Sequence, residues 1–432
     1  MESDRIPRPR REGQPAVAAT LRLSPDGSTT ACDRRETAET RRMEPIAILK
    51  DLIALPSVNP MGRTVTGPEF FEGRMTDYLV EYFARLGVPY QRIEIVPGRA
   101  NVVARLDRPG SKTTILFDAH QDTVPVDGMT IAPFEPQERD GRIYGRGACD
   151  VKGGMAAMLA AFAGLVRERP PGAANVVMSC TCDEESSVLG ILDLVKLWSD
   201  PARRGSLLDA RPDAAIVAEP TELDVVVAHK GATRWKLRTH GRACHSSSPA
   251  EGINAIYRMA RVLECLEEFA RELPSRVPPH PLCGPPTFSV GRIEGGISVN
   301  TVPDECTIEI DRRTIPGEET TDAVAQVIEF LQGRLDFEVE MVPPWTRAQA
   351  LPDDENLPWA DRLLPHVRAV RGRGEKVGVP YGTHASRLAA AGLPSVVFGP
   401  GSIAQAHTKD EWIAIDQVNA AAEIYYRFAA AG

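Results

Sequence analysis

Five short apolar runs, separated by segments with helical spacing, constrain most strongly what this chain can fold into. They cover residues 101–106, 114–117, 174–180, 214–217 and 394–398. Short, nearly continuous apolar runs are typical of strands that are buried on both faces of an α/β sheet. Functional residues in such sheets gather at the carboxyl ends of the strands. The sequence therefore predicts an α/β fold with a site at one edge of its sheet.

Residues 231–342 have a different pattern and are predicted to form an inserted domain. An alternating strand at 233–239 precedes a helix in which Met259 and Leu266 are in register. Two strands near 287–293 and 305–312, a helix at 322–331 and an alternating run at 337–341 follow. The order βαββαβ predicts a ferredoxin-like, four-stranded sheet with two helices on one face. Residues 44–230 and 343–432 would form the larger domain, since 432 residues exceed the usual size of a single core.

Residues 1–43 differ from both predicted domains. They are rich in Arg and show no apolar period, so we interpret them as a disordered N-terminal extension. Met43 directly precedes the first helical pattern, and an over-extended start is the simplest interpretation of this segment.

Composition excludes several classes of function. A net charge of −9 argues against nucleic-acid binding, which needs a basic surface. The chain has no run of 18 apolar residues, so no membrane span is predicted, and the Ala-rich stretch 155–166 is interpreted as a buried helix. The 8 cysteines form no CxxC pair, which favours a reduced, cytoplasmic setting over a disulfide scaffold or a thiolate zinc site.

Polar residues with metal-binding chemistry follow the predicted strands. His120 could bind a metal while Asp122 orients its imidazole. Asp150 lies in a glycine-rich turn, where its carboxylate could approach two ions and bridge them. Glu184 and Glu185 are adjacent and point in different directions, so one can bind a metal while the other acts as general base. These residues alone do not decide which glutamate has which role.

Glu219 and His407 complete a predicted ligand set of two histidines and three carboxylates. Nitrogen and oxygen donors without thiolate favour zinc, with cobalt or manganese as alternatives. Taken singly, each residue has an ordinary explanation, because a Glu pair is usually a solvated surface and an Asp among glycines usually forms a turn. Their combination is harder to explain in this way, since buried strands rarely end repeatedly in acids.

Five segments resemble the motifs of a known enzyme family. In chain order they are DAHQDTVP, GRGACDVKGGMAA, TCDEES, VAEPTE and AHTKDE. They are similar to motifs of the dinuclear zinc amidohydrolases related to acetylornithine deacetylase, succinyl-diaminopimelate desuccinylase, aminoacylase and glutamate carboxypeptidase. The resemblance extends from about residue 45 to the end of the chain.

The resemblance implies a role for each residue of the site. His120 and Glu219 would bind one ion, Glu185 and His407 the other, and Asp150 would bridge them. Glu184 would be the general base and Asp122 the partner of His120. The family thus assigns the two adjacent glutamates, which the residues alone left open.

The inserted segment resembles the family as well. GRACHSSSPAEGINAI supplies His245, which the resemblance places in the neighbouring subunit's site, near the oxyanion. Asn300 would contact substrate nearby, and Arg313 would bind the substrate carboxylate through its guanidinium. In YGTHASRL, His384 stands where relatives carry an acid and would line the substrate side of the pocket. A solvated loop histidine at 245 and a tolerated substitution at 384 are the ordinary alternatives.

These observations predict a metal-dependent amidohydrolase that acts on N-acyl amino acids and resembles acetylornithine deacetylase. It would hold two divalent cations, most simply Zn²⁺, and form a homodimer through the inserted lid domain. Neither nucleic acid nor membrane is an expected partner. The alternatives are a succinyl-diaminopimelate desuccinylase, a dipeptidase or carboxypeptidase, and a catalytically silent binding protein.

Overall fold

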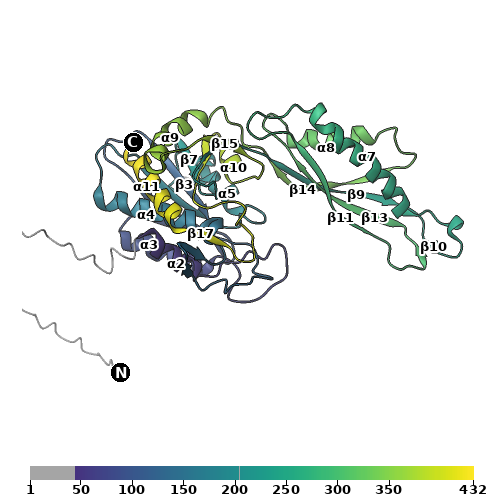
Figure 1. Ribbon diagram of the computed structural model, residues 1–432, viewed down its shortest axis with the longest axis horizontal. Helices are drawn as coiled ribbons and strands as arrows, with labels where there is room; N and C mark the ends of the chain where they lie inside the picture. Colours follow the sequence, from purple (N-terminus) through teal and green to yellow (C-terminus); the bar gives the residue numbers. More distant parts are fainter. Residues whose placement is uncertain (1–43, 204) are drawn as a thin grey trace, which may run out of the picture.

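A computed structural model describes residues 44–203 and 205–432, and the N-terminal extension considered above lies outside these residues. Figure 1 shows a larger α/β part at the left, from which a second sheet with its own helices extends to the right. The predicted fold class is confirmed. The elements are described in turn below, first the larger part and then the insertion.

The larger part is built on an eight-stranded mixed sheet with the order β1-β2-β6-β3-β7-β16-β8-β15. The β1–β2, β2–β6 and β8–β16 pairs are antiparallel, and the other neighbours are parallel. In chain order the strands are β1 (Tyr90–Val96), β2 (Arg99–Leu106), β3 (Thr114–His120), β6 (Asn175–Thr181), β7 (Ala214–Val217), β8 (Val225–His229), β15 (Lys376–Val379) and β16 (Ser395–Val397).

The five apolar runs predicted as strands are β2, β3, β6, β7 and β16. Their side chains are buried on both faces, and β3 shows why its run is nearly continuous. Ile115 and Phe117 belong to the core on one side of the sheet, whereas Leu116 belongs to the core on the other. A strand that is covered on both faces has no position left for a solvent-facing residue.

Helices cover both faces of the large sheet. One core includes residues of α2 (Pro45–Ile53), α3 (Gly73–Leu86), α4 (Gly153–Glu168), α9 (Leu357–Arg371) and α11 (Ile415–Ala430). The other includes α5 (Leu189–Leu194), α6 (Lys196–Ser199) and α10 (Ala385–Ala390). Helix α3 begins only at Gly73, because Phe71 has φ 66° and the chain is still turning there.

Helix α4 is the central helix of the larger core. The stretch Ala148–Glu168 is apolar and long enough to cross a membrane by length and composition, but 94% of its apolar window is buried inside the structure. This burial agrees with the expected core helix. A Cβ at Gly154 would lie 2.9 Å from the Cβ of Ala218, so glycine lets the start of α4 approach the end of β7.

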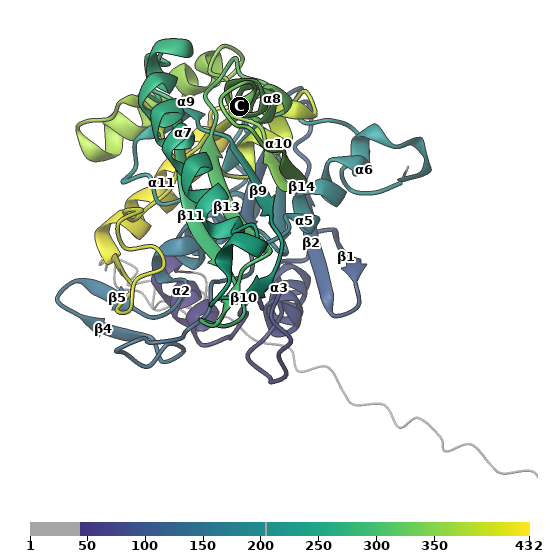
Figure 2. The same ribbon diagram turned by 90° about the vertical axis from the view of Figure 1, so that its right-hand side faces the viewer.

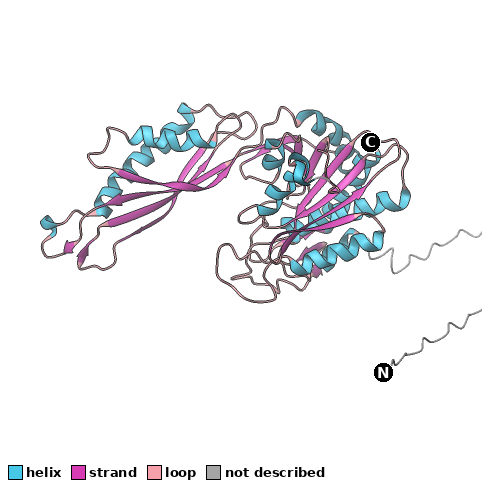
Figure 3. Cartoon of the chain, turned by 180° about the vertical axis from the view of Figure 1, so that it is seen from behind, coloured by secondary structure: helices cyan, strands magenta, loops and turns pink. Residues whose placement is uncertain are grey.

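The insertion is a four-stranded antiparallel sheet with the order β11-β13-β9-β14. Its elements are β9 (Ala232–His240), α7 (Ala255–Arg276), β11 (Thr287–Gly295), β13 (Glu305–Arg313), α8 (Thr320–Leu331) and β14 (Val339–Ala348). This is the predicted βαββαβ order, and both helices lie on one face of the sheet (Figure 3). The last strand continues past residue 342, where the sequence had placed the domain boundary.

Short elements complete the described chain. The pair β10 (Cys244–His245) and β12 (Thr301–Val302) lies at the end of the insertion remote from the larger part (Figure 1). A three-stranded sheet joins β17 (Trp412–Ala414), β5 (Arg142–Tyr144) and β4 (Gln137–Arg139), which Figure 2 shows at the edge of the larger part. Three short helical turns are η1 (Ala148–Lys152), η2 (Pro201–Arg203) and η3 (Pro249–Glu251).

Candidate metal centre

The predicted metal ligands converge at the carboxyl ends of the central strands. His120 is the last residue of β3, and Glu219 follows β7. Glu185 follows β6, and Asp150 lies in the turn before α4. His407 lies in the loop after β16. Because β6, β3, β7 and β16 run parallel to one another, their carboxyl ends share one edge of the sheet.

Two clusters of ligand atoms share one residue. His120, Asp150 and Glu219 form the first cluster, and all three are buried. Asp150, Glu185 and His407 form the second, and within each cluster the ligand atoms lie within 4.8 Å of one another. All five residues proposed as ligands therefore lie together, with Asp150 common to both clusters.

The carboxylate of Asp150 faces both histidines. Its Oδ1 lies 3.1 Å from Nε2 of His120, and its Oδ2 lies 3.3 Å from Nε2 of His407. His407 Nε2 is also 3.3 Å from Oε1 of Glu185. Each oxygen of Asp150 thus serves a different cluster, which is the arrangement that a bridging carboxylate needs.

The charges of the site perturb its titratable groups. Burial raises the pKa of Glu184, and burial with the charge of Asp150 raises the pKa of Glu219 well above its usual range. The same two causes raise the pKa of Glu185 to about 8. Burial also disfavours the charged form of Asp150, but hydrogen bonds from His120 and His407 hold its pKa below the usual range.

The same carboxylates also raise the pKa values of the two imidazoles. Burial lowers the pKa of His120, but the hydrogen bond to Asp150 and the charge of Glu184 outweigh it and leave the pKa raised. Hydrogen bonds to Asp150 and Glu185 raise the pKa of His407 to about 10. Concentrated negative charge at a water-poor site is neutralised either by bound protons or by cations.

The donors of both clusters fit divalent cations. Each cluster offers imidazole nitrogen and carboxylate oxygen, and neither contains a cysteine. Each also provides three protein ligands, which leaves coordination positions open, as catalytic rather than structural sites do. The site could therefore hold two cations and still admit substrate or water.

The turn after β6 separates the two adjacent glutamates. Glu185 belongs to the second cluster, whereas Glu184 belongs to neither. Asp183, which precedes them, has φ 64°, a left-handed conformation that turns the chain sharply. Of the two residues, Glu184 is therefore the one whose carboxylate remains available for proton transfer.

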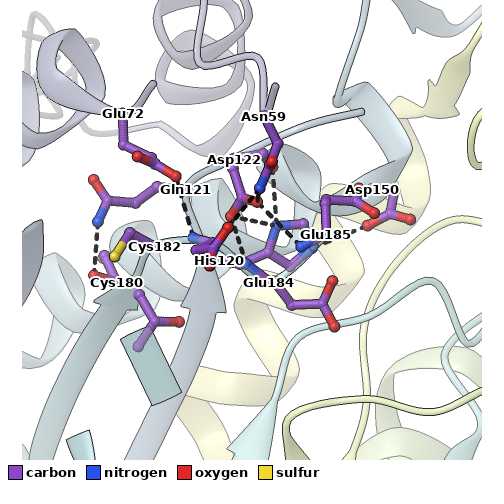
Figure 4. Close-up of polar contacts among 12 residues, drawn as sticks. Asn59, Glu72, His120, Gln121, Asp122, Asp150, Cys180, Cys182, Glu184 and Glu185 are labelled. Carbon is purple, nitrogen blue, oxygen red and sulfur yellow. Dashed lines mark hydrogen bonds and ion pairs between the residues drawn. The ribbon is translucent and has the colours of Figure 1, made fainter. Parts of the chain in front are cut away.

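Asp122 contacts its surroundings differently from what the sequence suggested. Its backbone carbonyl oxygen, not its carboxylate, lies 2.9 Å from Nδ1 of His120, and the nearest carboxylate oxygen is 3.8 Å away. The carboxylate instead accepts hydrogen bonds from the backbone N–H groups of Glu184 at 3.0 Å and Glu185 at 3.1 Å. Figure 4 shows this carboxylate beside the turn that carries both glutamates.

A buried polar network behind this turn was not found from the sequence. Asn59 Nδ2 donates to Asp122 Oδ2 at 2.8 Å and to Asp183 Oδ1 at 3.0 Å. Arg99 Nη1 donates to Asp183 Oδ1 at 2.6 Å and pairs through its other nitrogens with Glu72, which also accepts the backbone N–H of Asp183 at 3.1 Å. Isolated polar residues beside apolar segments were the only signal in the sequence.

Three other predicted site residues lie away from these clusters. His245 is exposed in β10, where its Nδ1 lies 2.7 Å from the Oγ of Ser247. Asn300 is nearby, because its carbonyl oxygen accepts the N–H of Ser246 at 3.0 Å. Arg313 ends β13, and its Nε donates to Asp311 Oδ1 at 2.7 Å. The structure thus groups His245 with Asn300 but does not bring them to the metal ligands of the same chain.

His384 is buried close to the first cluster. Its Nδ1 lies 2.9 Å from Asp118 Oδ2, and its ring centroid is 6.5 Å from that of His120. Its Nε2 is buried and has no hydrogen-bond partner among the described residues. Asp118, a buried acid inside β3, is an additional site residue that the sequence did not reveal.

Comparisons with known proteins agree with this geometry. Residues 116–431 match the family described as Peptidase family M20/M25/M40. Over 381 residues the chain is 32% identical to the acetylornithine deacetylase of Pectobacterium atrosepticum. The aligned region covers 85% of this chain and 92% of that protein.

Solved structures share the fold at lower identity. A metallo-carboxypeptidase of the M20 family from Sulfolobus solfataricus superposes with a TM-score of 0.70 at 20% identity, covering 90% of this chain and 98% of that one. A dinuclear metal-binding peptidase of the M20 family from Bacillus subtilis has a TM-score of 0.64 at 16% identity, with coverage of 90% and 96%.

Proposed function

The chain belongs to the peptidase family M20/M25/M40, and we propose that this metal-dependent hydrolase cleaves the amide bond of N-acyl amino acids. The acetylornithine deacetylase from Pectobacterium supports this acyl-amino-acid assignment. The main structural support is the pair of ligand clusters that share Asp150, with Glu184 beside them but in neither.

The two clusters would hold two divalent cations. His120 and Glu219 would bind one, Glu185 and His407 the other, and Asp150 both. Zinc is the best match to imidazole and carboxylate donors, with cobalt and manganese as alternatives. When bound, such cations polarise a substrate carbonyl and lower the pKa of water, so that hydroxide is available near neutral pH.

Glu184 would carry the proton in this reaction. It would accept a proton from the attacking water and return it to the amine that leaves when the amide bond breaks. Burial raises the pKa of Glu184, which brings the carboxyl closer to the operating pH and favours both transfers. Asp122 would support this role by binding the backbone N–H groups of Glu184 and Glu185.

Residues outside the clusters would bind substrate. Arg313 lies on the helix-free face of the inserted sheet and would bind the substrate carboxylate in place of Asp311. His245 and Asn300 would contact the reacting carbonyl from a partner subunit. His245 belongs to β10, which lies at the remote end of the insertion (Figure 1), and Asn300 binds the N–H of the adjacent Ser246. His384 would line the acyl or side-chain pocket, where its buried Nε2 offers a hydrogen bond.

A homodimer through the insertion would bring His245 to the other subunit. The insertion exposes large apolar side chains that a soluble monomer rarely exposes together. Val299 is 100% exposed, Ile297 92%, Tyr257 73% and Ile293 55%. These residues support an interface between two copies of the inserted domain.

The substrate class can be tested with one panel of compounds. N-acetyl amino acids, N-succinyl amino acids and dipeptides would be assayed with protein loaded with zinc or cobalt, and kcat/KM compared. We expect the N-acetyl amino acids to give the highest values. A preference for N-succinyl compounds would indicate a desuccinylase, a preference for dipeptides would indicate a peptidase, and no hydrolysis at all would indicate a silent binding protein.

The same assay tests the general base. Glu184→Gln keeps the size of the side chain but cannot accept the proton, so we expect hydrolysis of the best substrate to fall about 100- to 10,000-fold. The variant should still bind two cobalt ions, since Glu184 is in neither cluster. Glu264→Gln on α7 is the control and should behave as wild type, because this residue is exposed on the insertion.

A further inference from the structure

Glu411 is a buried carboxylate next to the turn that carries Asp150. Its side chain is 1% exposed and lies in the loop that follows His407. Its Oε1 accepts the backbone N–H groups of Cys149 at 2.9 Å and Asp150 at 3.0 Å. A single carboxylate oxygen thus binds the backbone of the residue whose side chain is shared by both clusters.

The second oxygen of Glu411 extends the contact. Oε2 accepts the backbone N–H of Gly147 at 2.9 Å and Nη1 of Arg146 at 2.7 Å. These donors belong to one short segment, so Glu411 binds that segment at several successive positions. Arg146 is itself buried and donates through Nη2 to the carbonyl of Pro125 at 3.0 Å.

The turn at Asp150 cannot satisfy these N–H groups by itself. Its backbone is not helical at Asp150, with φ −120° and ψ 94°, and Gly147 has φ 79°. A buried N–H without an acceptor costs about 1–3 kcal/mol. An external acceptor is therefore needed to keep this turn in place, and Glu411 provides it.

The backbone also joins the loop of Glu411 to this turn. The N–H of Gly145 donates to the carbonyl of Glu411 at 3.0 Å, and β17 pairs with β5 through Trp412 and Tyr144. His407 precedes Glu411 in the same loop and has φ 60°. Two ligands of the second cluster, Asp150 and His407, are thus carried by segments that Glu411 holds together.

We propose that Glu411 is a positioning residue that sets the bridging carboxylate of Asp150 and fixes it relative to His407. This inference rests on the two-cation centre proposed above. The first cluster also has His120 and Glu219, which extend from strands, so it depends less on Glu411. The second cluster depends on two loops, so a fault at Glu411 should weaken the second cation more than the first.

The test is a cobalt titration of metal-free, full-length protein. Glu411→Gln keeps the shape of the side chain but replaces one acceptor oxygen with an NH₂ donor. In one orientation this NH₂ group would face the N–H of Gly147 and Arg146, and in the other the N–H groups of Cys149 and Asp150. We expect wild type to bind two cobalt ions and Glu411→Gln to bind the second about 10- to 100-fold more weakly. Cobalt absorption spectra would report each binding step directly, without an activity assay.

A matched control separates positioning from general loss of stability. Glu318 in the insertion has a side chain that is only 8% exposed, and it accepts Arg312 Nη2 at 2.6 Å and the N–H of Ile315 at 2.9 Å. Glu318→Gln should bind both cobalt ions as wild type does. If it loses the second ion to the same extent as Glu411→Gln, the proposed role of Glu411 is wrong.

The remaining outcomes are also informative. If folded Glu411→Gln, as judged by its urea midpoint, binds both ions with wild-type affinity, Glu411 does not position the centre. If Glu411→Gln does not fold, the same titration would use Glu411→Asp, which keeps the charge but has a shorter side chain. Weaker binding of the second cobalt ion would again support the proposal, and wild-type affinity for both ions would contradict it. Wild-type protein that binds fewer than two cobalt ions would contradict the two-cation centre itself, which is a separate result.

Discussion

At the scale of single residues, the centre depends on how Asp150 divides its two oxygens. Oδ1 faces His120 and Oδ2 faces His407, at 3.1 and 3.3 Å. A neutral amide at this position would offer one oxygen and one NH₂ group, so it could serve only one of the two clusters. The shared carboxylate also raises the pKa of its neighbours, which makes the second cluster sensitive to pH.

Cation binding to the second cluster should release protons at neutral pH. Without metal, Glu185 has a pKa of about 8 and His407 a pKa of about 10, so at pH 7 both carry a proton. Metal ligands must be deprotonated, so binding displaces these protons. We expect affinity for the second cation to increase as pH rises through 8 and towards 10. Calorimetric titration with zinc in buffers of different ionisation enthalpy would measure the protons released.

The same pKa shifts predict how the stability of the metal-free protein changes with pH. Both pKa values are raised above those of an unfolded chain, so the folded protein holds more protons in this range and becomes less stable as pH increases. For Glu185 the loss develops from about pH 4.5 to 8, and for His407 from about pH 6.5 to 10. A urea midpoint of metal-free protein that did not fall between pH 6.5 and 8 would contradict these assignments.

At the scale of elements, turns rather than strands determine where several ligands point. Asp183 and His407 have φ values of 64° and 60°, which residues other than glycine seldom adopt. Such conformations persist where surrounding structure holds them. For Asp183 the surrounding structure is the network of Asn59, Arg99 and Glu72, which binds its carboxylate and its N–H group.

Asn59 should therefore contribute to activity although it is not a ligand. Asn59→Asp would place a third carboxylate between those of Asp122 and Asp183, where the amide now donates to both. We expect kcat to fall about 10- to 100-fold, because the turn carrying Glu184 and Glu185 shifts. Steady-state kinetics with the best substrate would measure this loss.

The matched control is another buried asparagine in the same domain. Asn356 Nδ2 donates to the carbonyl oxygens of Val227 and Pro352, and its Oδ1 accepts the N–H of Ser395. Asn356→Asp should lower the urea midpoint but leave kcat almost unchanged. An equal loss of kcat in both variants would show that Asn59 acts only through overall stability.

The sequence predicts strands better than it predicts these turns. The apolar runs predicted β3, β6 and β7, because burial on both faces leaves a clear pattern. The residues that follow or end these strands then indicated His120, Glu185 and Glu219 as ligands. Strand β1 is half exposed and β15 is a short edge strand, so neither has that pattern. The contacts of Asn59, Arg99 and Glu411 join segments far apart in the chain, and no local pattern reports them.

At the scale of the whole molecule, the distance between His245 and the metal ligands requires an explanation. The β10 strand lies at the remote end of the insertion (Figure 1), so His245 is expected to serve a partner subunit. Mixing inactive His245→Ala and Glu184→Gln proteins tests this. Half of the dimers would be mixed, and each would have one intact site, so about a quarter of wild-type activity should return.

The interface can be tested independently of activity. Val299→Asp puts a charge on a fully exposed apolar residue of the insertion, and Leu192→Asp does the same on the larger part, where Leu192 is 39% exposed. Light scattering should give about twice 47.0 kDa for wild type and Leu192→Asp, and a single chain for Val299→Asp. Mixing the His245→Ala and Glu184→Gln proteins could restore activity although light scattering shows only single chains. That result would contradict both the homodimer and the role of His245 in a partner subunit.

The position of β16 has a consequence for how the protein is made. This strand lies between β7 and β8 in the sheet, yet it comes after the whole insertion in the chain. The ribosome therefore completes the inserted sheet while the larger sheet still has a gap, with the edges of β7 and β8 open to other chains. His120, Asp150 and Glu219 emerge before this gap closes, and His407 only afterwards. A nascent chain would thus complete the first proposed cation site early, whereas the second would wait until translation is almost finished.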